Sequence, residues 1–468
     1  MITAPPHSSA PLSNPWWALV VLLAGTLLPP LDFFVVNTAL PFIQQDLHAN
    51  EAATQLVVSA YAATYAVFLI TGGRLGDLYG RRRVFLAAMA GFSLASLWCG
   101  LASSAIMLVI GRILQGAAAA VMAPQALASI HAIFPENYKQ RALGLYGVTF
   151  GMAAVIGQVL GGWLIDMDLF GLGWRNLFLV NVPVLLIAIP AALWLVPENK
   201  AEHPQRLDPI GIVLLATALA CLIIPLVEGR HLDWPFWSLV MLLVSLPLFM
   251  LFWRHEHRMF SQGHDPLVVP AVFDAPGIVR GLLATVFFYA IAPFFLMFAI
   301  HQQAYAHLSP LHVGLSILPL GVGFLLGPLF SGWCIKAAYQ RYVASIGIII
   351  ELLGVWGTGS VAAGTHTAWL PVTLFLVGFG EGMALPSLVR YVVQRVDRRW
   401  AGLAAGLVNS VLQCSSALFV ALEGGLFFSL SHPHTAIHVA SAFTVTCGVI
   451  GGLLLISAWL AYPRRENI

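Results

Sequence analysis

The sequence predicts an all-α membrane protein that crosses the bilayer many times. Hydrophobic residues make up 59% of its 468 residues and charged residues only 9%, whereas a soluble domain is roughly 45–50% apolar. The apolar residues also gather in blocks of about 20 or more, the length of helix that crosses a hydrocarbon core. A soluble chain could not bury so much apolar surface, so we expect a bundle of spanning helices.

Fourteen apolar blocks form the predicted spans. They cover residues 16–40, 54–72, 84–103, 106–130, 142–165, 175–196, 208–227, 236–253, 278–300, 311–333, 342–361, 368–391, 401–430 and 437–461. The first block has no basic residue before it and no small-residue cleavage site after it. We therefore expect it to remain as a helix rather than to be removed as a signal peptide.

The distribution of Lys and Arg predicts the orientation. With both termini placed in the cytoplasm, all but three of the 22 Lys and Arg residues lie in or beside cytoplasmic loops or in the C-terminal tail; the exceptions are Arg112, Arg175 and Arg230. Positive charge concentrates on the cytoplasmic side of membrane proteins. We expect a multi-pass protein of the inner (cytoplasmic) membrane with both termini inside.

Polar loops divide the chain into parts. We expect a cytoplasmic tail over 1–15, a six-helix bundle over 16–196, two additional helices with linkers over 197–277, a second six-helix bundle over 278–461 and a tail over 462–468. The loop with Lys336 and Arg341 is a weak echo of an arginine-rich loop in the first bundle. Internal repeats of this kind are common in transporters.

That arginine-rich loop is Gly73–Arg83, with three glycines, one acid and four arginines. Glycines permit a tight turn, and Asp77 can cap a helix start or pair with an arginine of a facing element. A pair formed in only one conformation would act as a latch. The candidate latch residues are Gly73, Asp77, Gly80, Arg81 and Arg82. The alternative, an ordinary positive-inside loop, explains the arginines but not the glycine–aspartate frame.

The chain shows no sequence signal for a cofactor. None of its three lysines ends a Gly-x-x-x-x-Gly-Lys loop, the pattern of a nucleotide-binding site. Its five cysteines, all in or beside apolar segments, lack the paired spacing of a metal site or a disulfide framework. We expect no metal and no cofactor, so an ion gradient would have to drive any uphill transport.

Five ionisable residues lie within predicted spans: Asp32, Arg112, Glu351, Glu381 and Glu423. Such residues are costly in a bilayer and usually functional. Four acids and one base favour a cation-binding cavity, and a carboxyl group in a low-dielectric site can carry a proton. At 1.5 Å per residue, Asp32 and Arg112 lie at similar depth and can pair. For each acid the alternative is a structural hydrogen bond to a neighbouring helix.

Small residues recur along the fifth span at three- and four-residue spacing. This pattern lets two helix backbones approach closely, so it indicates either tight packing or a surface on which helices rock. The glycines concerned are Gly147, Gly151, Gly157, Gly161 and Gly162.

Together these motifs resemble the major facilitator superfamily, specifically its fourteen-helix drug:proton antiporters. In the arginine-rich loop, Gly76 and Leu78 depart from the family signature, and the matching residues are Gly73, Leu75, Asp77, Gly80, Arg81 and Arg82. In the fourth span, the matches to a motif whose buried arginine is implicated in proton coupling are Leu108, Arg112, Gln115 and Gly116. Further similar segments are Leu31-Asp32, Trp174-Arg175, Asn181-Val182-Pro183 and Leu207-Asp208 with Gly211.

The fifth span is similar to the antiporter motif of that family. Gly157, Gly161 and Gly162 fit the motif, which is associated with export, whereas Gln158 stands where the motif has proline.

This resemblance implies the major facilitator fold, with two six-helix bundles and two extra helices, and a transporter rather than an enzyme. It implies proton-coupled export of lipophilic, cationic compounds by a monomer, without nucleic acid as a partner. Phe33, Phe34, Tyr61 and Tyr65 can offer π-faces to such cations or simply pack. Two alternatives remain: export of an endogenous metabolite, siderophore or lipid-like amphiphile, and a membrane sensor or scaffold that transports nothing.

Overall fold

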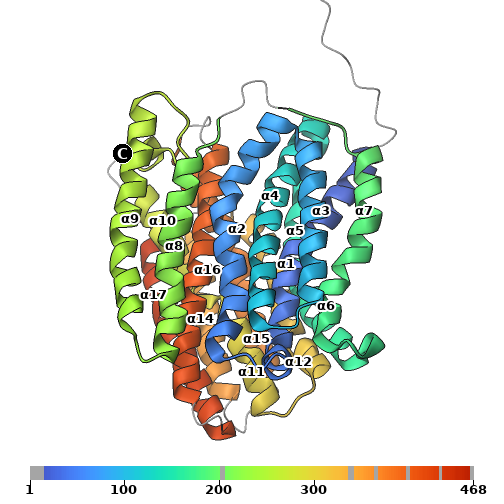
Figure 1. Cartoon of the computed structure of the whole chain (residues 1–468), viewed down its shortest axis with the longest axis vertical. Coiled ribbons are helices and arrows are strands. Elements are labelled where there is room, and N and C mark those ends of the chain that lie inside the picture. Colours follow the sequence, from blue (N-terminus) through green and yellow to red (C-terminus); the bar gives the residue numbers. More distant parts are fainter. Residues whose placement is uncertain are drawn as a thin grey trace, which may run out of the picture.

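A computed structural model describes residues 15–200, 206–335, 342–362, 367–396, 401–431 and 435–463. In these residues every regular element is helical, and the long helices stand side by side (Figure 1). Within the described ranges, thirteen helices are long and apolar enough to cross a membrane. The remaining predicted span, 142–165, lies inside α5 (Glu136–Met167), a helix of 32 residues. Each predicted span therefore falls on one helix or on a series of consecutive helical elements.

The first group of helices packs around aromatic and aliphatic side chains that include Leu22, Phe85 and Phe92, all with no exposed surface. Polar side chains start two of these helices: Asn50 accepts a hydrogen bond from the Ala53 amide, and Ser104 accepts one from Met107, as expected of N-caps. Besides α5, this N-terminal bundle contains α1 (Pro15–Asp46), α2 (Glu51–Tyr79), α3 (Arg81–Gly100), α4 (Ala105–Ile133), α6 (Asn176–Leu179) and α7 (Asn181–Leu195).

The second group of helices has its own core, in which Phe294, Phe298, Phe427 and Phe443 are fully buried. This C-terminal bundle contains α10 (Ile278–Phe288), α11 (Phe294–Ala304), α12 (Pro310–Ser316), α13 (Leu318–Ile335), α14 (Val343–Ala362), α15 (Leu370–Val393), α16 (Ala401–Ser431) and α17 (Ala436–Ala461).

Two further helices, α8 (Pro209–His231) and α9 (Phe236–Ser261), pack on each other, and α8 also contacts α2 and α16. They lie at one side of the molecule in Figure 1. The outer face of α9 exposes large apolar side chains such as Leu243 and Met250. Such a face suits contact with lipid rather than with water. The fold is thus two helical bundles with an added pair, while the residue boundaries of the three parts stay a prediction, and Lys336 and Arg341 lie outside the described residues.

Prolines break two of the predicted spans. The span predicted over 278–300 consists of α10, a short 3-10 turn (Tyr289–Ile291, η4) and α11, and the break falls just before Pro293. The span predicted over 311–333 is divided at Ile317, next to Pro319. Proline has no amide hydrogen to continue the helical ladder. In contrast, α1 continues through Pro29 and Pro30.

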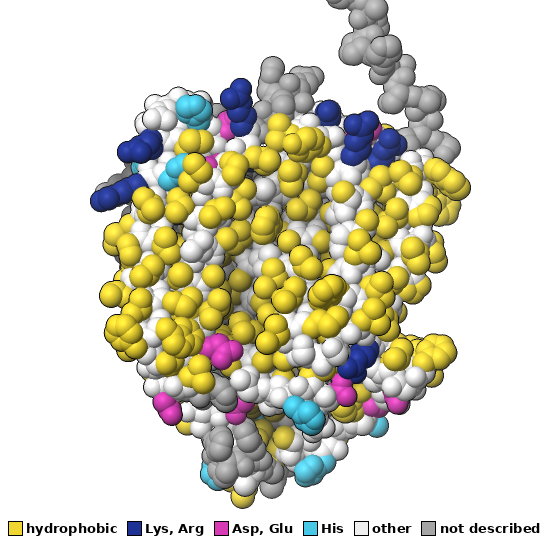
Figure 2. Space-filling model, viewed as in Figure 1, with side chains coloured by type: hydrophobic (Ala, Val, Ile, Leu, Met, Phe, Trp, Pro, Cys, Tyr) yellow, Lys and Arg dark blue, Asp and Glu magenta, His cyan; other side chains and the backbone are white. Residues whose placement is uncertain are grey.

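Charge separates the two ends of the molecule. Figure 2 shows a broad hydrophobic belt with Lys and Arg side chains gathered mainly at one end of the visible face. We call this the basic end; it is where α2 meets α3 at Gly80, and the opposite end is where α1 meets α2. The belt and the spans identify a multi-pass membrane protein.

Candidate functional site

The N-terminal bundle buries an ion pair between Asp32 of α1 and Arg112 of α4. A guanidinium nitrogen of Arg112 contacts the Asp32 carboxylate, and both side chains are 0% exposed. The two residues, which the sequence predicted to be able to pair, do form an ion pair in the structure. Their role in proton coupling stays a prediction.

Two amides complete the surroundings of Asp32. Gln115 of α4 and Asn181 of α7 each donate a hydrogen bond of 3.1 Å to Asp32 Oδ1. Both amides also donate to the Ser96 hydroxyl of α3, at 2.9 and 3.3 Å. The carboxylate therefore has a positive partner and neutral donors from two helices, α4 and α7, the condition under which a buried charge is tolerated.

Arg112 is held from several directions. Its Nε donates to the Val57 carbonyl at 2.9 Å, and its Nη1 donates to Gln115 Oε1 at 2.8 Å. Its guanidinium carbon also lies 4.2 Å from the centre of the Tyr61 ring. That ring was a candidate π-face for a substrate; in this conformation it serves the protein's own cation.

The C-terminal bundle holds the other three candidate acids. Glu351 of α14 and Glu381 of α15 interact electrostatically where these two helices pack closely, at Gly380, and Glu423 of α16 lies near Cys447 of α17. All three acids are at most 5% exposed. Among the described residues, neither oxygen of Glu351 or Glu423 has a hydrogen-bond partner. The five candidates thus form separate groups, with Asp32 and Arg112 in one bundle and the glutamates in the other.

The arginine-rich segment is more helical than predicted. Residues 73–79 continue α2, Arg81 begins α3, and only Gly80 lies between them. Gly80 has φ of 102°, a conformation that favours glycine, and this allows the chain to reverse in one residue. Asp77 forms an ion pair with Arg81 at 3.0 Å, so its partner here is in its own turn rather than on a facing element.

The facing element is the segment after α7, which the sequence did not indicate. Glu198 accepts a hydrogen bond of 3.1 Å from the Arg82 amide and lies within 4 Å of the side chains of Arg82 and Arg83. The Arg81 amide donates to the Asn199 carbonyl at 2.9 Å. Glu198 thus places a negative charge at the N-terminus of α3, where such a charge stabilises a helix.

Arg74 joins the N-terminal bundle to the added helix pair. It is 5% exposed, and its guanidinium donates to the carbonyls of Arg206, Asp265 and Pro266. Nearby, burial raises the pKa of the Asp208 carboxyl, but hydrogen bonds from the Gly211 amide and His255 outweigh burial and hold that pKa below its ordinary value. Arg74, which the sequence analysis explained by membrane topology alone, therefore also connects the N-terminal bundle to the added helix pair.

The glycines of α5 pack on both bundles. A Cβ at Gly157 would lie 3.0 Å from the Leu31 carbonyl, and one at Gly161 would lie 2.5 Å from Thr38 Oγ1, both in α1. A Cβ at Gly162 would overlap the backbone of Pro310 in α12. α5 is therefore a tight contact within one bundle and between the two. Gly147 and Gly151 lie in α5 at positions where only the backbone is described.

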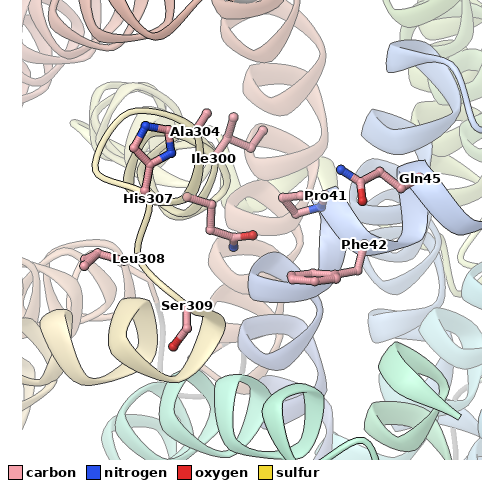
Figure 3. A pocket seen from close by; sticks show the side chains of 9 residues that line it. Pro41, Phe42, Gln45, Ile300, Ala304, His307, Leu308 and Ser309 are labelled. Carbon is pink, nitrogen blue, oxygen red and sulfur yellow. The ribbon is translucent and has the colours of Figure 1, made fainter. Parts of the chain in front are cut away.

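Contacts at the opposite end join the bundles. The Ser309 hydroxyl donates to Asp166 of α5 at 3.0 Å, and Gln303 donates to the Thr38 carbonyl at 3.2 Å. Beside them lies a pocket of ≈460 Å³ between α1 and the end of α11 (Figure 3). Its lining residues are Pro41, Phe42, Gln45, Ile300, Gln303, Ala304, His307, Leu308 and Ser309.

Comparison with known proteins identifies the family. The family model described as Major Facilitator Superfamily matches residues 22–421. The chain belongs to this superfamily. It is therefore a transporter and not an enzyme, and the resemblance inferred from the motifs is confirmed.

Curated relatives are similar over most of this transporter. It is 35% identical over 425 residues to the probable actinorhodin transporter of Streptomyces coelicolor. This alignment covers 90% of this chain and 74% of the relative. It is 32% identical to the puromycin resistance protein of Streptomyces alboniger, over 100% of this chain and 95% of the relative. It is also 33% identical to the drug efflux pump JefA of Mycobacterium tuberculosis, over 81% and 74%.

Solved structures show the same fold at low identity. A bacterial homolog of the human lysosomal transporter Spinster, in an inward-facing and occupied conformation, aligns with a TM-score of 0.70 at 15% identity and covers 97% of both chains. A D-xylose–proton symporter aligns with a TM-score of 0.68 at 14% identity, over 96% of this chain and 97% of the other. These two likenesses support the major facilitator fold.

Proposed function

We propose that this transporter is a proton-coupled antiporter that exports lipophilic, cationic compounds by alternating access between its two bundles. It acts as a monomer in the cytoplasmic membrane, with the basic end and both termini facing the cytoplasm. The names of its relatives, which include drug efflux, antibiotic export and antibiotic resistance proteins, support the export of drug-like molecules.

The observation that carries the proposal is the buried pair of Asp32 and Arg112. Arg112, a proton and a cationic substrate would compete for the same carboxylate. A proton from outside neutralises Asp32 and weakens its hold on a bound cation, which leaves outward. Loss of that proton to the inside restores the carboxylate as the next substrate binds. Glu381 and Glu423 are second candidates for the proton carrier.

A second candidate function is export of an endogenous metabolite, siderophore or lipid-like amphiphile. It is favoured by relatives whose names specify one natural product, such as the tetracenomycin C resistance and export protein of Streptomyces glaucescens and the cephamycin export protein of Amycolatopsis lactamdurans.

Transport into inverted membrane vesicles tests both candidates. We expect vesicles that contain the protein to accumulate ethidium or a quaternary ammonium compound only when a proton gradient is present. Uptake that is the same with and without the proton gradient would exclude proton-coupled antiport. Uptake of an anionic metabolite without uptake of any cation would exclude the cationic substrate class while leaving proton coupling in place.

A further inference from the structure

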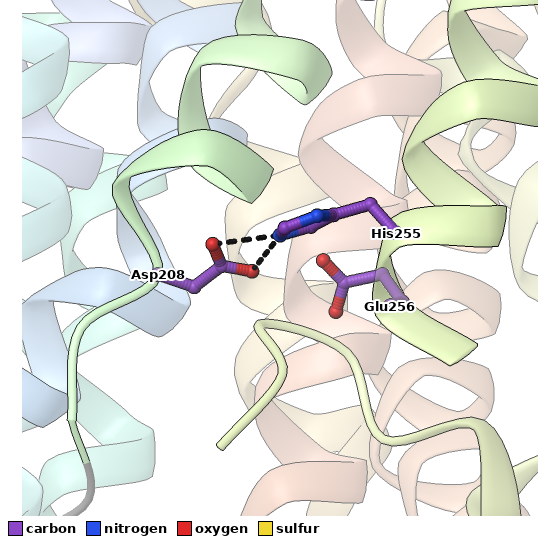
Figure 4. A group of neighbouring side chains, drawn as sticks. All are labelled: Asp208, His255 and Glu256. Carbon is purple, nitrogen blue, oxygen red and sulfur yellow. Dashed lines mark hydrogen bonds and ion pairs between the residues drawn. The ribbon is translucent and has the colours of Figure 1, made fainter. Parts of the chain in front are cut away.

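Three ligand-type side chains meet at the basic end, far along the chain from the transport candidates. Asp208 directly precedes α8, and His255 and Glu256 lie in the last turns of α9. One donor atom from each residue lies within 4.8 Å of the other two (Figure 4). The function proposed above makes no use of this cluster.

The cluster is closely packed and incompletely satisfied. His255 Nε2 lies 3.0 and 3.1 Å from the two Asp208 oxygens. Glu256 Oε2 accepts a hydrogen bond of 2.6 Å from the Val268 amide. Glu256 Oε1 receives no hydrogen bond from an N–H or O–H donor of the described residues and interacts instead with the carboxyl group of Asp208. Glu256 is 0% exposed and Asp208 2% exposed. A buried carboxylate oxygen without a hydrogen-bond donor is costly.

The carboxyl groups of Asp208 and Glu256 lie against each other in this corner, and a cation between them would relieve their repulsion. A Cβ at Gly211 would lie 2.7 Å from Glu256 Oε1 and would also overlap the Asp208 carboxyl, so two acids approach the first turn of α8 together. Arg74, whose charge acts on both Asp208 and Glu256, donates its hydrogen bonds to three backbone carbonyls. Its charge moderates the repulsion between the carboxylates, but its hydrogen bonds are directed to the backbone.

Although the spacing of the cysteines predicts no metal site, we propose that Asp208, His255 and Glu256 bind a divalent transition-metal ion of the Zn²⁺ class. One imidazole nitrogen and two carboxylate oxygens form a donor set that suits such an ion. The ion takes the place of the direct contact between His255 and Asp208 and gives Glu256 Oε1 a positive partner. Water completes the coordination from the side of His255, whose side chain is 17% exposed.

Binding would clamp the start of α8 to the end of α9. Arg74 joins the N-terminal bundle to the same region, so the ion would stabilise the attachment of the added helix pair. This role concerns the assembly of the transporter and is independent of its substrate.

Zinc titration of the purified full-length protein in detergent tests the proposal. After treatment with a chelator, zinc affinity is measured by competition with a chromophoric chelator, and the melting temperature is measured with Zn²⁺ and with Mg²⁺. The variants are His255→Gln and Glu256→Gln. The matched control is His264→Gln, because His264 is an exposed histidine close in sequence to the site.

We expect the wild type and His264→Gln to bind one Zn²⁺ and to melt at a higher temperature in its presence. Both site variants should lose at least about tenfold in affinity. A wild type that neither binds Zn²⁺ nor gains melting temperature would overturn the proposal, and so would His255→Gln binding as tightly as the wild type. If Glu256→Gln fails to fold, the wild type and His255→Gln still decide. Transport is not measured, so neither result bears on the efflux mechanism.

Discussion

The two bundles treat their buried acids in different ways. In the N-terminal bundle, Asp32 contacts Arg112, Gln115 and Asn181 and has no exposed side-chain surface. In the C-terminal bundle, Glu351 and Glu423 are equally buried, but their oxygens have no hydrogen-bond partner within the described part of the chain. Removing the partners of a buried ionised group costs much free energy. A buried acid without hydrogen-bond partners loses no such interaction when it is protonated. The first bundle is thus built around one buried charged pair, whereas the described residues of the second bundle show no such pair around its three candidate acids.

Removal of the basic partner should have the largest effect on stability. Arg112→Leu leaves the Asp32 carboxylate buried without its counter-charge, and we expect a loss of about 3–5 kcal/mol in the free energy of unfolding. The loss is measured by thermal or denaturant unfolding in detergent. As a control, adding Asp32→Asn to Arg112→Leu should restore part of the stability. A single variant as stable as the wild type would show that the pair is not what holds the N-terminal bundle together.

Neutralising Asp32 should have the largest effect on transport. Asp32→Asn keeps the side-chain shape but removes the titrating group, and we expect it to abolish gradient-driven efflux of ethidium while expression is maintained. Efflux and the amount of protein in the membrane are measured together. Glu381→Gln is the matched variant in the other bundle and should retain more activity. Wild-type efflux by Asp32→Asn would remove Asp32 from the mechanism and give the C-terminal acids the leading role.

Neutralising Glu351 should change stability little. Glu351→Gln exchanges an unpartnered acid for an amide of the same shape, so we expect the free energy of unfolding to change by less than about 1 kcal/mol. The measurement is the one used for Arg112→Leu. A loss as large as that of Arg112→Leu would mean that the C-terminal bundle also depends on a charged partner, and the contrast between the bundles would fail.

A similarly small effect on stability is expected at Asp77. Its ion pair with Arg81 is partly exposed, with Asp77 36% and Arg81 20% exposed, and such pairs contribute at most about 1 kcal/mol. For Asp77→Asn we expect slower transport with nearly unchanged substrate affinity, measured from the rate and the concentration dependence of efflux. A large loss of affinity would contradict the latch. Glu198→Gln tests whether the contacts of Glu198 with Arg82 and Arg83 also affect the rate of transport.

Much of the fold followed from the sequence because membrane spans need only length and apolar character. Every span predicted from these properties falls on helical structure. The exceptions depend on the backbone of single residues: the breaks before Pro293 and beside Pro319, and the reversal at Gly80 alone. The sequence does not show whether a proline within an apolar run interrupts a helix, because α1 continues through two of them.

The sequence predicted those site residues that are unusual within a membrane span. Asp32 and Arg112 attract attention because charge within a span is rare. Ser96 could not be recognised from the sequence as part of the site, since a single serine in an apolar helix has no distinguishing pattern. Glu198 and Arg74 were also missed in their structural roles, because charged residues at the ends of spans are ordinary.

Composition and local motifs were enough to show that this chain spans a membrane many times, which end carries the positive charge and that it belongs to the Major Facilitator Superfamily. Helix packing, in contrast, settles which buried acid has a basic partner and which acids have no partner among the described residues. It also decided that Asp208 meets His255, 47 positions along the chain. The physical reason is the same in each case: a side chain's partners come from other helices, and helix packing sets which faces meet.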